Sequence, residues 1–62
     1  MQVIAEANRI KDRLRACKTR DEIERVAAEE RATVINMRVA VGGKPLAIQI
    51  AHLKARMIEG MS

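Results

Sequence analysis

The chain has 62 residues, a formal net charge of +4, 48% apolar residues and no aromatic residue. That apolar fraction excludes a disordered tail, whereas a domain of this size buries only about 60% of the surface that its unfolded chain exposes. One cysteine and one histidine supply neither a disulfide framework nor a zinc site. We therefore expect one small domain over residues 1–62 that self-association or a partner stabilises.

The composition also predicts an all-α protein of the cytoplasm. Alanine, which has the highest helix propensity and lets helices approach closely, occurs ten times. No apolar run reaches the roughly 18 residues needed to cross a bilayer, and the N-terminus lacks the pattern of a signal peptide. A lone cysteine, Cys17, fits a reducing compartment and is expected to be a small core residue. No membrane partner is therefore expected.

The first predicted helix spans about residues 2–17. Its apolar residues recur at spacings of four and three, which places them on one face. They are Val3, Ala7, Ile10, Leu14 and Cys17. Arg9 and Arg13 lie on one flank of this face, as charged residues do beside a coiled-coil seam.

The second predicted helix, about residues 20–40, begins with a capping signal. In the motif "TRDE", Thr19 is expected to cap the helix while Glu22 reaches back to close a capping box. The join to the first helix is then very short, which favours two antiparallel neighbours.

Two apolar stripes continue along this second helix, on faces roughly 140° apart. One stripe holds Ile23, Val26, Ala27, Val34 and Met37, and the other holds Ala28, Ala32, Ile35 and Val39. A helix that is apolar on two sides is expected to be covered on two sides. Glu30 projects within the first stripe, where it is expected to pair with a cation or lie at the rim, because an unpaired buried carboxylate is costly.

The stretch "VGGKPL" holds two of the three glycines and the single proline. It contains Gly-Lys, but it lacks the earlier glycine of a phosphate-binding loop and has Pro45 where the hydroxyl residue belongs. It therefore predicts a turn, after which Pro45 starts a third helix over about residues 45–59. Leu46, Ile50, Leu53 and Met57 form the apolar row of that helix. An alternative stays open, because residues 34–50 also alternate apolar and polar as a β-hairpin does.

No motif predicts catalysis. Serine occurs only at Ser62, and the adjacent carboxylates of Glu29 and Glu30 would point about 100° apart on a helix. We expect no enzyme activity, no metal and no cofactor.

Nucleic-acid binding is a second reading of the positive charge. Residues 1–18 hold five basic and two acidic side chains, and residues 42–62 hold three and one. The acids that open the second helix oppose its insertion into DNA, and no aromatic residue is present to stack on bases. Candidate contacts to a partner or to nucleic acid are Arg9, Arg13, Lys44, Gln49, His52 and Arg56.

The stretch "TRDEIERVAAEERATVINM", followed by a short turn and "PLAIQIAHLKARMIEGM", resembles the small helical segments common in bacteriophage and prophage proteins. The likeness lies in an acidic capped helix, a middle rich in Ala, Glu and Arg, a short turn and a further helix. It implies a small phage accessory protein that binds a host or phage protein, and it carries over no functional residue.

These patterns predict an all-α helical hairpin or three-helix arrangement that self-associates, as a homodimer, into a helical bundle. The expected interface consists of Ile23, Val34, Ile35, Met37, Val39, Leu46, Ile50, Leu53 and Met57. The expected function is a non-enzymatic protein-binding module that presents a helical face. The alternative is a small basic DNA-binding transcriptional regulator.

Overall fold

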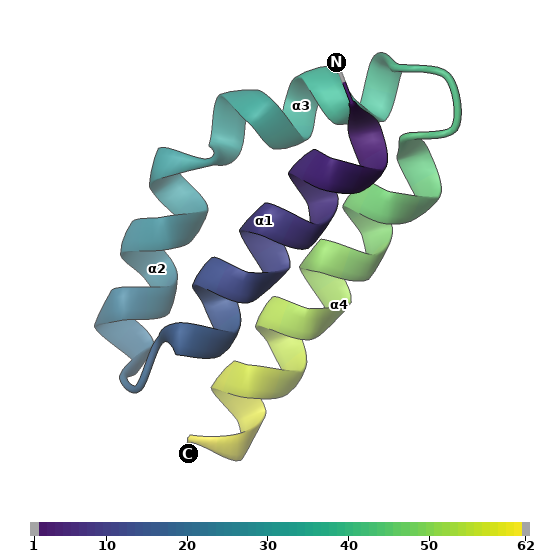
Figure 1. Ribbon diagram of the computed structural model, residues 1–62. Coiled ribbons are helices and arrows are strands. Elements are labelled where there is room, and N and C mark those ends of the chain that lie inside the picture. The colour runs from purple at the N-terminus through teal and green to yellow at the C-terminus, as the bar shows by residue number, and fades with distance from the viewer. Residues whose placement is uncertain (1, 62) are drawn as a thin grey trace.

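The structure, a computed structural model, describes residues 2–61 and consists of helices joined by short turns (Figure 1). The helices are α1 (Val3–Ala16), α2 (Arg20–Glu29), α3 (Arg31–Val39) and α4 (Lys44–Gly60). Over residues 2–61 no strand forms, so the all-α prediction is confirmed and the alternative of a hairpin at residues 34–50 is wrong. The predicted single helix over residues 20–40 is corrected to two helices, α2 and α3.

The helices α1 and α4 run side by side in the same direction (Figure 1). α2 and α3 return the chain from the end of α1 to the start of α4. As the short join predicts, α2 runs back along α1. The start of α1 therefore lies at the same end of the molecule as the turn between α3 and α4. The end of α4 lies near the opposite end, toward the join of α1 and α2.

The core draws on all four helices. Its buried residues are Ala7, Ile10, Leu14, Ile23, Val26, Met37, Ala47 and Ile50. Those of the first helix repeat the predicted spacing of three and four, so the row predicted for residues 2–17 is the inner face of α1. The half-buried side chains of Leu46, Leu53 and Met57 on α4 pack against this core.

The break between α2 and α3 lies at Glu30, whose φ of −94° and ψ of 5° depart from helical values. Helical hydrogen bonding continues on both sides, because the Glu30 amide donates to the Val26 carbonyl at 2.9 Å and the Val34 amide donates to the Glu30 carbonyl at 2.9 Å. The bend lets Val26 and Met37 reach one core. The second stripe is left outside, with Ile35 and Val39 exposed by 53% and 83%.

The N-terminus of α2 carries the predicted cap. The Glu22 amide donates to Thr19 Oγ1 at 3.2 Å. In return, Glu22 Oε1 accepts from the Lys18 amide at 3.3 Å and from the Thr19 hydroxyl at 3.1 Å. The reciprocal contact thus reaches one residue further back than in a standard capping box.

The "VGGKPL" stretch is a turn, as predicted. Gly42 has a φ of +74°, in the region that favours glycine. Gly43 is buried, and a Cβ atom there would lie 1.9 Å from the Met37 carbonyl oxygen, so only glycine fits this approach of the turn to α3. α4 then begins at Lys44, with Pro45 in its first turn.

Candidate functional site

Glu30 is the one charged residue that is buried in the described chain, with 6% of its surface exposed. Its carboxylate accepts two hydrogen bonds from Arg9, at 2.6 and 2.9 Å, and one from Arg13 at 2.7 Å. The Arg9 hydrogen bonds lower the pKa of the Glu30 carboxyl from 4.5 to about 2, against the opposing effect of burial and with further help from Arg13. The expectation that Glu30 pairs with a cation is confirmed.

Arg9 and Arg13 are occupied by these internal contacts. Arg9 Nε also donates to Glu6 at 2.7 Å, and Arg13 donates to Glu29 at 2.6 Å. These hydrogen bonds, to Glu30 and Glu6 for Arg9 and to Glu29 and Glu30 for Arg13, raise the pKa of both guanidinium groups. The two arginines therefore hold α1 against the α2–α3 break, and the structure does not bring them together with the other candidate contacts.

The residues of the predicted interface lie in three different environments. Ile23, Met37 and Ile50 belong to the core of the single chain and are not on its surface. Val34, Leu46, Leu53 and Met57 are half-buried against that core. Ile35 and Val39 are exposed. These three residues therefore do not form a surface of this fold. The bend at Glu30 turns the stripe of Ile23 and Met37 inward, and Ile50 meets the same core from α4.

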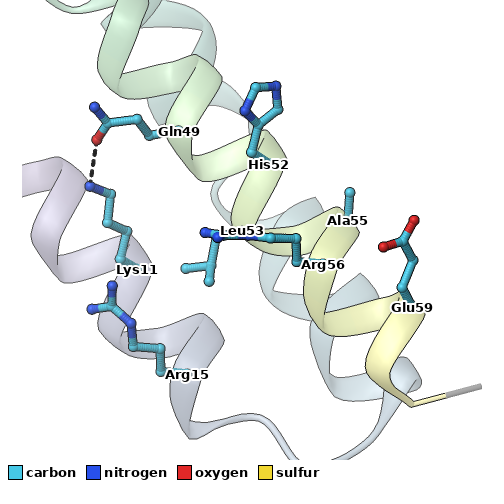
Figure 2. A pocket seen from close by; sticks show the side chains of 8 residues that line it. All are labelled: Lys11, Arg15, Gln49, His52, Leu53, Ala55, Arg56 and Glu59. Atoms are coloured by element: carbon cyan, nitrogen blue, oxygen red, sulfur yellow. Dashed lines mark hydrogen bonds between the residues drawn. The ribbon is translucent and has the colours of Figure 1, made fainter.

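A basic hollow of about 480 Å³ lies between α1 and α4 (Figure 2). It is lined by Lys11, Arg15, Gln49, His52, Leu53, Ala55, Arg56 and Glu59. Lys11 Nζ donates to Gln49 Oε1 at 2.8 Å, and the Arg56 side chain extends from α4 toward α1 (Figure 2). Three of the candidate contacts, Gln49, His52 and Arg56, thus share one surface.

Sequence reasoning did not place Lys11 and Arg15 in this hollow. Their spacing of four residues puts them on one face of α1, but only the pairing of α1 with α4 shows which side chains they face. Lys44 lies elsewhere, in a shallow depression at the start of α4 with Ile35, Arg38 and Val39.

A second hollow, of about 330 Å³, lies between the α2–α3 arm and α4; we call it the apolar groove. Its floor is apolar and comes mainly from the core and its margin: Ile10, Leu14, Val34, Ala47 and Ile50. Ile35, which is 53% exposed, lies at its edge. The sequence predicted apolar rows on the helices at either side of this groove, but it did not predict that a groove separates them.

The edge of the apolar groove is positively charged. It carries Arg31 and Arg38 on α3 and Lys54 on α4. Neither guanidinium group has a hydrogen-bond or ion-pair partner within residues 2–61, and Lys54 Nζ lies 3.5 Å from Glu24 Oε1. From 31 to 58 the sequence contains five Lys and Arg and no Asp or Glu.

Large apolar side chains are exposed mainly at one end of the molecule. Ile4, Ile35, Val39, Val41 and Ile48 are exposed by 69%, 53%, 83%, 101% and 45%. They belong to the start of α1, to α3, to the following turn and to the start of α4, which meet at this end (Figure 1). This surface adjoins the apolar groove through Ile35.

A cluster of metal-ligating side chains is not assembled in the described chain. Nowhere in residues 2–61 do three His, Cys, Asp or Glu side chains gather as metal ligands. Cys17 is half-buried, and its Sγ donates to the Arg13 carbonyl at 3.3 Å. Of the helices described here, none is long and apolar enough to cross a membrane.

Comparison of the chain with protein families, with curated protein sequences and with solved structures finds no match in any of the three. The resemblance to phage proteins therefore rests on the sequence pattern alone.

Proposed function

We propose that this chain is a non-enzymatic protein-binding module of the cytoplasm, and that it binds through the face formed by α3 and α4. The observation that carries the proposal is the apolar groove, with exposed Ile35 beside it and with Arg31 and Arg38, which have no ion-pair partner among the described residues, at its edge. Ligand and peptide sites are typically such concave apolar surfaces with a few convergent polar groups. The role of a small phage accessory protein is compatible with this activity.

The energetics support binding at this face. Covering an exposed Ile or Val side chain contributes about 1.5–3 kcal/mol, and residues that dominate binding lie in pockets surrounded by contacts that exclude water. Ile35 and Val39 leave 53% and 83% of their surface uncovered in the single chain. A partner that covers them gains the part of this energy that belongs to the uncovered surface, about half for Ile35 and most of it for Val39, at no cost to the core.

A homodimer is the second arrangement that we propose to test at the same face. Ile35, Val39 and Val41 are the exposed apolar residues nearest the turn after α3. Pairing two copies about a twofold axis would use this surface twice.

Affinity isolation from the organism that encodes the chain tests the protein-binding proposal. We expect the parent chain to retain a defined protein that Ile35→Asp loses. Ile4→Asp is the matched control, because Ile4 is also exposed, by 69%, but lies on α1 outside the groove lining. Retention of the same proteins by all three chains, or loss of them on nuclease treatment, would contradict the proposal.

The basic hollow favours one other function, binding of nucleic acid. Lys11, Arg15 and Arg56 converge there from two helices, and phosphate contacts of this kind weaken with salt, with a log–log slope of about −3 for three contacts. A DNA titration over a salt series measures this slope. If this function holds, Lys11→Glu with Arg56→Glu removes the binding, whereas Arg31→Glu with Arg38→Glu, which changes the net charge equally, leaves most of it.

A further inference from the structure

We propose that the apolar groove accepts a short acidic amphipathic α-helix of another protein. This inference rests on the proposed function and specifies the chemistry of the partner. An amphipathic helix in an apolar groove is a common mode of peptide recognition, in which apolar residues at positions i, i+3 or i+4, and i+7 enter the groove.

The length of the groove sets the length of its occupant. Along α3 the lining runs from Arg31 to Arg38, and along α4 it runs from Ala47 to Lys54. Seven residues of helix rise about 10 Å, or two turns. A helix of two to three turns, with one row of apolar side chains, therefore spans the groove.

The charge of the edge sets the charge of the occupant. Arg31 and Arg38 are two turns apart on one side, and Lys54 lies on the other side. Among the described residues, Glu30 is the one acid in the lining, and its carboxylate is already bound by Arg9 and Arg13. An incoming helix with carboxylates on both flanks of its apolar row would pair with Arg31 and Arg38 on one side, where guanidinium groups bind carboxylates through two parallel hydrogen bonds. On the other side it would share Lys54 with Glu24, whose Oε1 lies 3.5 Å from Lys54 Nζ.

A second copy of this chain fits the groove less well than such a helix. Its own α3–α4 face would bring Arg31, Arg38 and Lys54 against the same cations, because residues 31–58 contain no carboxylate. Its acidic helix, α2, exposes Asp21, Glu22 and Glu24, but in the described chain α2 exposes no large apolar side chain. Among the described residues, neither α2 nor the α3–α4 face therefore offers a helix surface that is both acidic and apolar.

Calorimetric titration with three synthetic helical peptides of about 14 residues, or four turns, tests this inference. The first is amphipathic with Glu on both flanks of a Leu row, the second replaces each Glu by Lys, and the third keeps the composition of the first but scrambles its periodicity. We expect the first to bind at least about tenfold more tightly than the other two, a difference typical of a few charge-assisted contacts.

Charge reversal provides the matched variants. Arg31→Glu with Arg38→Glu is expected to lose the acidic peptide and to gain the lysine peptide, whereas Lys11→Glu with Arg56→Glu has the same net charge and keeps the parent preference. Circular dichroism checks that each variant is folded. Equal binding of the acidic and lysine peptides, loss of binding in both double variants, or a stable dimer that no peptide dissociates would overturn the inference.

The affinity isolation described above separates failure of the acidic-helix proposal from failure of the protein-binding proposal. If a protein is retained through Ile35 but the acidic peptide does not bind, the chemistry assigned to the partner is wrong and the protein-binding module stands. If neither experiment detects binding, both are wrong.

Discussion

Glu30 connects three helices through one side chain and one bend. Its backbone separates α2 from α3, and its carboxylate holds α1 through Arg9 and Arg13. A buried carboxylate is tolerated here because hydrogen bonds from two cations offset its desolvation. The same contacts occupy the guanidinium groups of both arginines, whose side chains remain 46% and 39% exposed.

Glu30→Gln is expected to lower the free energy of unfolding by about 2 kcal/mol at pH 7, because it removes hydrogen bonds between charged groups. The pKa of Glu30 is lowered from 4.5 to about 2 in the folded chain, so its contribution is full above pH 4.5 and is lost as the pH falls toward 2. Urea unfolding at pH 7 and at pH 3 should show the difference between the two chains become smaller at pH 3 without vanishing, because pH 3 is still above the folded pKa of about 2. Glu29→Gln is the control, since Glu29 is 51% exposed and binds Arg13 alone; equal losses in both variants would contradict this account.

Gly43→Ala is expected to destabilise the fold by about 1–3 kcal/mol, as other changes that crowd a packed site do. The added Cβ would lie 1.9 Å from the Met37 carbonyl oxygen, so the turn or α3 must shift. Thermal melting measures the loss. Lys44→Ala, at the exposed neighbouring position, should change the free energy of unfolding by no more than about 0.5 kcal/mol. An unchanged melting temperature for Gly43→Ala would show that the turn does not need glycine there.

At the scale of the helices, the sequence predicted α1 and α4 to within one or two residues, because heptad spacing, the Thr19 cap and the Gly-Gly turn mark their ends. It did not predict the break at Glu30. Helical hydrogen bonding continues through that residue. The same pair of apolar stripes is expected for one straight helix that packs against neighbours on two sides and for two helices that bend toward one core. The choice depends on Arg9 and Arg13, which are 21 and 17 residues away in the chain.

Thr19→Ala should lower the free energy of unfolding by about 1 kcal/mol, the usual cost of an unfilled N-cap. The Thr19 hydroxyl accepts the Glu22 amide at 3.2 Å and is held by the Glu22 carboxylate. Thr19→Ser retains the oxygen and should stay close to the parent. Chemical unfolding compares the three chains, and an equal loss for Ser and Ala would mean that the methyl group, not the cap, matters.

At the scale of the whole molecule, the two hollows divide the candidate residues that the sequence grouped together. Gln49, His52 and Arg56 share the basic hollow because they recur on one side of α4, a spacing that the sequence displays. The apolar groove, with Arg31 and Arg38 at its edge, depends on how α3 crosses toward α4, and residue spacing does not encode this crossing. The one feature of the sequence that pointed to this basic edge is the absence of Asp and Glu from residues 31–58.

Two aspartate substitutions separate the core from the outer face. Ile50→Asp, which places a carboxylate at a site with 6% exposure, is expected to unfold the chain. Ile35→Asp, at 53% exposure, should melt within a few degrees of the parent at every concentration, because it changes only the surface of a single chain. Melts over a hundredfold concentration range test this, and a concentration-dependent melting temperature that Ile35→Asp lowers would establish the homodimer instead.

The most direct test of the binding face is a backbone-amide NMR titration of the labelled chain with the protein recovered by affinity isolation. We predict that the perturbed signals follow the two sides of the apolar groove, at residues 31–38 and 47–54, and that Lys11, Arg15 and Glu59, which line only the basic hollow, stay unchanged. Perturbations centred on Lys11, Arg15 and Arg56, with Arg31, Ile35 and Arg38 unmoved, would contradict the assignment of this face.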